Sequence, residues 1–156
     1  MYGIPKLVFS GGEPMVRSDF WEILDYTRKN YKGKIDIATN ATLINEANVD
    51  RLIANVNRLD ISIDGIDEDS CSEIRGKGVF NKVIRSINLL KERGFDEIYL
   101  SMVISDYNKE LKKGFLELNK ELGTQAVIRI FAPVGRGLKN SDKFITVSYT
   151  HLTLPT

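Results

Sequence analysis

Cysteine and histidine are almost absent from this sequence, which contains one of each, Cys71 and His151, among 156 residues. A single cysteine cannot close an intrachain disulfide. It also cannot supply the thiolates of a cysteine-only zinc or iron–sulfur site. Chains without disulfides are typical of reducing compartments, so we expect a cytoplasmic location.

The sequence also lacks an excess of charge of either sign and any long apolar run. Its 22 Lys and Arg residues nearly balance its 21 Asp and Glu residues, which leaves a formal net charge of +1. This balance favours neither nucleic acid nor an anionic membrane as a partner. No apolar stretch approaches the roughly 20 residues of a membrane span, and the N-terminus lacks the pattern of a secretory signal. Nothing in the composition indicates an oligomeric state.

What the sequence does contain is a regular alternation of strand-like and helix-like segments. Short apolar runs predict strands, and apolar residues at helical spacing predict the helices between them. Ser18 and Asn45 lie where helix N-caps are expected, and Gly94 and Gly123 lie where glycines commonly end helices. The predicted strands are 6–10, 34–39, 58–64, 97–104 and 126–131.

Five strands separated by helices predict an α/β fold with parallel pairing. The third strand helps to choose between a barrel and a doubly wound sheet. Asp60, Ser62 and Asp64 share one face of it, and Ile61 and Ile63 share the other. Strands covered by helices on both faces are normally apolar on both faces. We therefore favour a partial (β/α)6 TIM-like barrel, incomplete, with about five parallel strands and outer helices.

The end of the first predicted strand carries the most informative motif, Gly11-Gly12-Glu13-Pro14. Two glycines let the backbone turn sharply and leave its polar groups open to a ligand. Glu13 adds a negative charge, and Pro14 stiffens the exit. Ligands of α/β proteins bind at this edge of the sheet. The motif therefore predicts a pocket for a small, positively charged group such as an amine.

Polar residues follow two further strands and precede the longest predicted helix. They are Thr39-Asn40-Ala41-Thr42, Ser62-Ile63-Asp64-Gly65 and Arg75-Gly76-Lys77-Gly78. Each motif alone is compatible with ordinary turns and solvated charges. Their order and spacing, all at the carboxyl ends of strands, indicate one shared site.

Taken together, these motifs resemble those of the radical S-adenosylmethionine enzymes, most closely the SPASM-type peptide and sulfatase maturases. The resemblance covers roughly residues 6–137 and ends on a Pro-x-Gly-Arg motif at Pro133. It implies that Gly11 to Pro14 receive the amino group of S-adenosylmethionine, that Ser62 contacts this cofactor and that Arg75 pairs with its carboxylate. Thr39, Asn40 and Asp64 belong to the same cofactor-binding motifs, although Ala41 stands where the family motif has glycine.

One departure from the family pattern is large. The family holds a [4Fe–4S] cluster with a Cys-x-x-x-Cys-x-x-Cys loop after its first strand, and this sequence has no such loop. Cys71 is interpreted as a small loop or helix-edge residue instead. We therefore expect residues 1–140 to be a truncated core barrel without the first strand and cluster loop. Residues 141–156, which include His151, are expected to be a non-native or disordered tail.

The resemblance implies a parent enzyme that cleaves S-adenosylmethionine reductively, with its own cluster, to modify a peptide or protein substrate. The fragment itself is expected to be inactive. Two other functions stay open at the level of sequence. One is a non-catalytic α/β domain that binds a ligand or partner through the same pocket. The other is a phosphate-binding α/β barrel enzyme in which residues 75–78 bind an anion before a helix.

Overall fold

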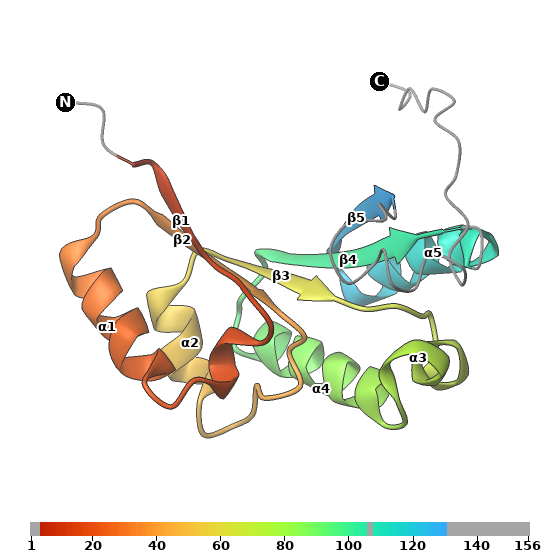
Figure 1. The fold of residues 1–156 in the computed structure, drawn as a ribbon, viewed down its shortest axis with the longest axis horizontal. Helices are drawn as coiled ribbons and strands as arrows, with labels where there is room; N and C mark the ends of the chain where they lie inside the picture. Colours follow the sequence, from red (N-terminus) through yellow and green to blue (C-terminus); the bar gives the residue numbers. More distant parts are fainter. Residues whose placement is uncertain (1–3, 106–107, 131–156) are drawn as a thin grey trace.

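The computed structural model describes residues 4–105 and 108–130, which form one parallel sheet with helices packed against it (Figure 1). The sheet has five strands in the order β1-β2-β3-β4-β5. The strands are β1 (Lys6–Phe9), β2 (Lys34–Thr39), β3 (Arg58–Ser62), β4 (Ile98–Ile104) and β5 (Gln125–Ile130). The α-helices are α1 (Phe20–Asn30), α2 (Val49–Asn55), α3 (Glu68–Arg75), α4 (Val79–Glu92) and α5 (Lys112–Leu122). Two short 3₁₀ helices are η1 (Pro14–Val16) and η2 (Lys109–Leu111).

The strand order confirms the predicted partial barrel. Each strand pairs in parallel with the next one along the chain, and the order never reverses. Right-handed crossovers that always advance in one direction place their helices on one side of the sheet. Figure 1 shows α1, α2, α3 and α4 on the same side. The doubly wound alternative is therefore wrong, because it needs a reversal of strand order and helices on both faces.

The hydrophobic core lies between the helices and the face of the sheet that they cover. Ile35, Ile37, Leu59 and Ile61 point to this side and are fully buried. The helices contribute large side chains of their own, which include Phe20, Leu24, Leu52, Ile87, Leu90 and Phe115. On the opposite face Val8 is 49% exposed and Val103 40% exposed, so no layer of helices covers them.

The uncovered, concave face carries charged side chains, as the polar alternation in the third strand predicted. Lys6 Nζ lies 3.1 Å from Asp36 Oδ2 on the neighbouring strand. Arg58 Nη2 lies 2.6 Å from Asp60 Oδ1, and its guanidinium carbon lies 3.4 Å from the centre of the Tyr99 ring. Because these groups are partly withdrawn from water, each pairing compensates for lost hydration.

The predicted ends of the helices are partly right. Gly94, with φ 74°, and Gly123, with φ 62°, follow α4 and α5 in the left-handed conformation, as expected. The two predicted N-caps are wrong. Asp19 precedes α1 instead of Ser18, and Asn48 precedes α2 instead of Asn45.

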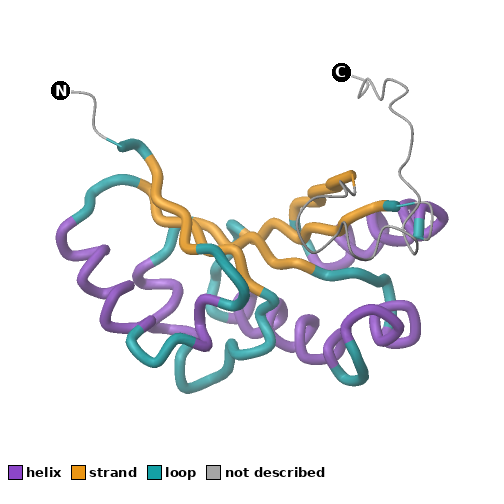
Figure 2. Tube along the Cα trace, in the orientation of Figure 1, coloured by secondary structure: helices purple, strands orange, loops and turns teal. Residues whose placement is uncertain are grey.

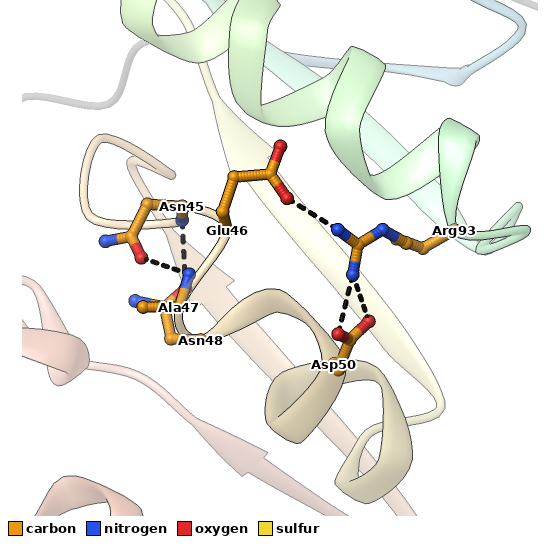
Figure 3. Close-up of polar contacts among 6 residues, drawn as sticks. All are labelled: Asn45, Glu46, Ala47, Asn48, Asp50 and Arg93. Carbon is orange, nitrogen blue, oxygen red and sulfur yellow. Dashed lines mark hydrogen bonds and ion pairs between the residues drawn. The ribbon is translucent and has the colours of Figure 1, made fainter.

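Asn45 has a different local role. Its Oδ1 accepts a hydrogen bond of 2.9 Å from the backbone N–H of Ala47, which makes a turn before the helix (Figure 3). Just beyond α4, Arg93 donates to Asp50 on α2 at 2.6 Å and to Glu46 at 2.5 Å (Figure 3). This guanidinium therefore joins the end of α4 to the start of α2. Exposed pairs of this kind stabilise a fold only slightly.

Helix α3 is the α-helix that the sequence did not predict. Eight residues with one buried side chain, Cys71, show no apolar stripe. A capping box starts the helix, since Asp67 Oδ1 accepts from the Ser70 backbone N–H at 2.8 Å and Ser70 Oγ accepts from the Asp67 N–H at 3.3 Å. The Asp67-x-x-Ser70 spacing was the available signal for this helix.

Replacing Asp67 with alanine should lower the free energy of unfolding by about 1 kcal/mol, the usual cost of losing an N-cap. The hydrogen bonds from Ser70 lower the pKa of Asp67. A carboxyl pKa that is lower in the folded state stabilises the fold at pH values above the ordinary Asp pKa. This stabilisation is lost as the pH falls through the lowered pKa of the folded state. Urea denaturation at pH 7 and near pH 3 measures both effects. Asp69→Ala, in the same helical turn, is the control and should cost less at pH 7.

Candidate functional site

The candidate site lies at the carboxyl edge of the sheet, where the turns after β1, β2 and β3 meet. The turns that follow β1 and β2 lie side by side (Figure 2). Their contact is a direct one between Glu13 of the first turn and Thr39 and Asn40 of the second. The structure thus brings together two motifs that are 26 residues apart in the sequence.

Glu13 joins these turns through its carboxylate. Its Oε2 accepts from the Asn40 backbone N–H at 2.7 Å, and its Oε1 accepts from the Thr39 hydroxyl at 2.8 Å and the Met15 backbone N–H at 3.2 Å. Pro14 is the first residue of η1, where its missing N–H costs nothing. A carboxylate has about four acceptor sites, so these three donors leave room for one more.

The two glycines before Glu13 are open. Both Gly11 and Gly12 are exposed, and a Cβ added to either would meet no atom within 4 Å. Gly11 has φ +143°, a conformation that residues with a side chain rarely adopt. The backbone of this turn is therefore accessible to a ligand.

The turn after β2 is tightly built. Asn40 Oδ1 accepts from the backbone N–H and the hydroxyl of Thr42, at 2.9 and 2.7 Å. Ala41 has φ 58°, a left-handed conformation that glycine adopts more readily than alanine. This conformation costs an alanine about 1–2 kcal/mol. The Ala41 N–H donates to Thr39 Oγ1 at 2.9 Å, and its carbonyl accepts from Ser86 at 2.8 Å.

The third motif reaches the same edge. Ser62, the last residue of β3, has its Oγ 3.5 Å from the carbonyl oxygen of Thr39. Asp64 follows, and its Oδ2 accepts from Arg75 Nε at 2.5 Å. Arg75 is the last residue of α3, so this helix carries the guanidinium back to the strand end. Side-chain exposures of 27% for Arg75 and 16% for Asp64 show a pair that water partly reaches.

A cavity of about 440 Å³ lies between the turn after β2 and the turn after β3, and neither residues 11–14 nor Ser62 line it. It is lined by Asn40 and Thr42 from the turn after β2, by Asp64 from the turn after β3, and by Ile74, Arg75 and Val79 from the two following helices. The cavity therefore offers amide, hydroxyl, carboxylate and guanidinium groups beside an apolar wall. Such mixed linings are typical of small-molecule sites.

The proposed anion loop at residues 75–78 is already occupied by the protein. Glu68 Oε1 accepts from the Gly78 backbone N–H, and Glu68 Oε2 accepts from the Asn81 backbone N–H at 3.3 Å. These N–H groups are the ones that a phosphate would need at the start of α4. The carboxylate of Glu68 caps this helix instead, which argues against the phosphate-binding alternative.

Cys71 lies in the middle of α3 with no exposed surface. The predicted place in a loop or at a helix edge is therefore wrong, and Cys71 is a small, buried packing residue in the helix interior. Burial raises the pKa of its thiol, and a partial opposing effect comes from a backbone hydrogen bond with Asp64. The neutral thiol is therefore favoured, which suits packing and not nucleophilic or metal-binding chemistry.

The raised pKa of Cys71 predicts how the thiol and the fold respond to pH. A thiol reagent at pH 8 should react slowly with the folded chain and rapidly after denaturation, because burial blocks access and suppresses the thiolate. A raised folded pKa stabilises the fold below the ordinary thiol range of about 8.5, and this stabilisation is lost as pH rises through the folded pKa. Denaturant melts between pH 7 and 10 should show the decline. The Cys71→Ala variant should lose this part of the slope, and an unchanged slope would contradict the assignment.

Two features of the site were missed by sequence reasoning. Helix α3 carries Arg75, and Glu68 caps α4. Only the capping box of α3 left a local signal. The predicted motif at Pro133, Gly135 and Arg136 lies outside the described residues.

Within the part of the chain that the structure describes, no group of three or more His, Cys, Asp or Glu side chains could hold a metal ion. None of the described helices combines the length and the apolar character needed to cross a bilayer.

A parallel half-barrel whose polar turns gather at the carboxyl edge defines the class of this protein, a (β/α)-barrel domain with a ligand site at that edge. The chain matches the Radical SAM superfamily over residues 1–118, and it belongs to that superfamily.

Curated relatives agree with this assignment. The mycofactocin maturase MftC of Mycolicibacterium smegmatis is 34% identical over 128 residues, which cover 81% of this chain and 32% of the maturase. The AdoMet-dependent heme synthase of Methanosarcina barkeri is 36% identical over 154 residues, which cover 96% of this chain and 43% of the synthase. The chain therefore spans less than half the length of these relatives.

Solved structures agree on the fold. Native anSMEcpe with bound AdoMet aligns with a TM-score of 0.68 at 25% identity, over 80% of this chain and 36% of that chain. Streptococcus suis SuiB aligns with a TM-score of 0.70 at 21% identity, over 83% of this chain and 30% of that chain. These likenesses confirm the predicted partial barrel, and the maturase relatives support the predicted peptide-modifying branch.

Proposed function

We propose that the carboxyl edge of this sheet is a cradle for S-adenosylmethionine. The supporting observation is that Glu13 accepts hydrogen bonds from the turn after β2, and that Asn40 of this turn lines one cavity together with Asp64 and Arg75. The proposed cofactor-binding residues are Gly11, Gly12, Glu13, Pro14, Thr39, Asn40, Ser62, Asp64 and Arg75.

The chemistry of these groups suits the two ends of an amino acid. The exposed backbone of Gly11 and Gly12 and the remaining acceptor site of Glu13 suit an ammonium group. The guanidinium of Arg75 suits a carboxylate, because its planar fork matches two oxygens. The methionine part of S-adenosylmethionine carries both groups on one carbon.

The superfamily implies an iron–sulfur cluster, which supplies the electron that splits the sulfur–carbon bond of the cofactor. The residues described here do not fit such a cluster, because the single thiol of the sequence is buried inside α3. We therefore assign no step of the reaction to these residues beyond binding and orienting the cofactor. In this proposal, residues 1–140 are part of a core barrel, and cluster ligands are supplied by chain outside this sequence.

For the whole protein, we propose a peptide or protein substrate. The relatives that support this include MftC, which is named as a maturase, and anSMEcpe, which was solved with AdoMet and a peptide. A second candidate is a tetrapyrrole, because the heme synthase of Methanosarcina barkeri is 36% identical over nearly the whole of this chain. Mass spectrometry of products from both substrate classes, with the whole protein, separates them.

Cofactor binding is testable on the chain itself. Isothermal titration with S-adenosylmethionine should show saturable binding that is weak, with a Kd of about 1 mM, because these residues do not supply the cluster that would also hold the cofactor. ATP, which has an adenosine but no amino acid, is the control and should bind more weakly. Equal binding of ATP, or no saturable binding of S-adenosylmethionine, would contradict the proposed cradle.

A further inference from the structure

The ion pair between Asp64 and Arg75 has a consequence for how the cavity binds its ligand. Arg75 uses its Nε–H for Asp64, at 2.5 Å, and the structure shows no other partner for this guanidinium among the described residues. Both side chains line the same cavity. A guanidinium held at Nε has a fixed plane, and its two Nη groups stay available as donors.

We propose that Asp64 is a positioning residue, which holds the guanidinium of Arg75 in the orientation that receives a ligand carboxylate. The inference rests on the proposed function, and it gives Asp64 a role that differs from direct contact with the cofactor. A bare carboxylate beside a carboxylate ligand would repel it. Hydrogen-bonded to Arg75, Asp64 contributes orientation while the guanidinium makes the contact.

The backbone around Arg75 is fixed from two sides, so the side chain is the remaining source of freedom. In its middle, α3 packs so closely on Gly65 that a Cβ on this glycine would lie 2.6 Å from Cys71 Cα. Just after its end, Glu68 accepts from the Gly78 backbone N–H and so ties the loop to the helix. A free arginine side chain loses considerable rotamer entropy on binding, and the bond to Asp64 reduces that loss before the ligand arrives.

Two substitutions of Asp64 separate orientation from charge. Asp64→Asn and Asp64→Ala both remove the negative charge, which by itself would strengthen attraction of a carboxylate to Arg75. The Asn variant keeps an oxygen that accepts from Nε, and the Ala variant does not. The affinity difference between the two variants therefore measures positioning alone.

The test is titration of S-adenosylmethionine into these variants of the full 156-residue chain. Asp64→Ala should bind about tenfold more weakly than Asp64→Asn, as expected for loss of a coupled contact. The difference should vanish with 5′-methylthioadenosine, which lacks the carboxylate, and in an Arg75→Met background. Asp60→Ala is the control. It breaks the ion pair between Asp60 and Arg58, which both lie on β3 and do not line the cavity, and it should leave the affinity for S-adenosylmethionine unchanged.

Other outcomes of these titrations contradict either the positioning role of Asp64 or the proposed function. Equal affinity of the Asn and Ala variants, or the same difference with 5′-methylthioadenosine, overturns the positioning role alone. If Asp60→Ala weakens binding of S-adenosylmethionine as much as Asp64→Ala does, the positioning role is also wrong, because the lower affinity would then come from a change in the fold. If the unmodified chain does not bind S-adenosylmethionine, the proposed function fails and this inference fails with it. If the unmodified chain binds S-adenosylmethionine and Arg75→Met binds it equally well, the inference and the pairing of Arg75 with the carboxylate are both wrong, and the proposed ammonium site at Glu13 still stands.

Discussion

Replacing Gly65 with alanine should lower the free energy of unfolding by about 3 kcal/mol or more, which is at the upper end for overpacking. The new Cβ would lie 2.6 Å from Cys71 Cα and 2.7 Å from the Ser70 carbonyl carbon, with the Cys71 backbone nitrogen nearer still. These are backbone atoms of α3, so no rotamer change can make room. The helix must move away from the strand end, and Arg75 moves with it. Urea denaturation measures the loss.

Gly114→Ala is the matched control for this prediction. There the added Cβ would lie 2.7 Å from Ile66 Cδ1, the tip of a side chain that can rotate away. Gly114 lies inside α5, where alanine is favoured over glycine by about 0.8–1.0 kcal/mol. We expect a change close to zero. If both alanine variants are equally stable, the close packing of α3 on Gly65 is wrong.

Replacing Glu13 with alanine should weaken binding of S-adenosylmethionine by about 1.5–3 kcal/mol, the range for a hydrogen bond to a charged group. The same change should destabilise the fold by about 1–3 kcal/mol, because the donors from Asn40, Thr39 and Met15 lose their acceptor. Calorimetric titration measures the first effect and thermal unfolding the second. Both are expected because one carboxylate joins two turns and faces the proposed ammonium site.

The control is Glu22→Ala, which removes an exposed carboxylate in the first turn of α1. It changes the net charge equally and should alter neither affinity nor stability by more than about 0.5 kcal/mol. If the Glu13→Ala variant is less stable but binds S-adenosylmethionine with normal affinity, Glu13 stabilises the two turns and does not bind the cofactor. A variant that binds normally and melts normally would remove it from the site.

The sequence by itself determined the strands, most of the helices and the motifs at their ends. The alternation along β3 predicted the uncovered polar face, because side chains point to opposite faces with a period of two. Gly94 and Gly123 ended the predicted helices correctly, since the left-handed conformation is inexpensive only for glycine. The strand-end motifs indicated one site because the carboxyl ends of parallel strands share an edge.

Only the tertiary structure decided how these motifs contact one another. Glu13 and Asn40 are 27 residues apart, and Asp64 and Arg75 are 11 residues apart, so no local pattern reports either contact. Helix α3 was missed because a polar segment with one buried residue has no hydrophobic periodicity, and packing on Gly65 stabilises it instead. The physical reason is the same in each case: local sequence encodes backbone preference and burial, whereas the pairing of side chains depends on where the folded strands and helices place them.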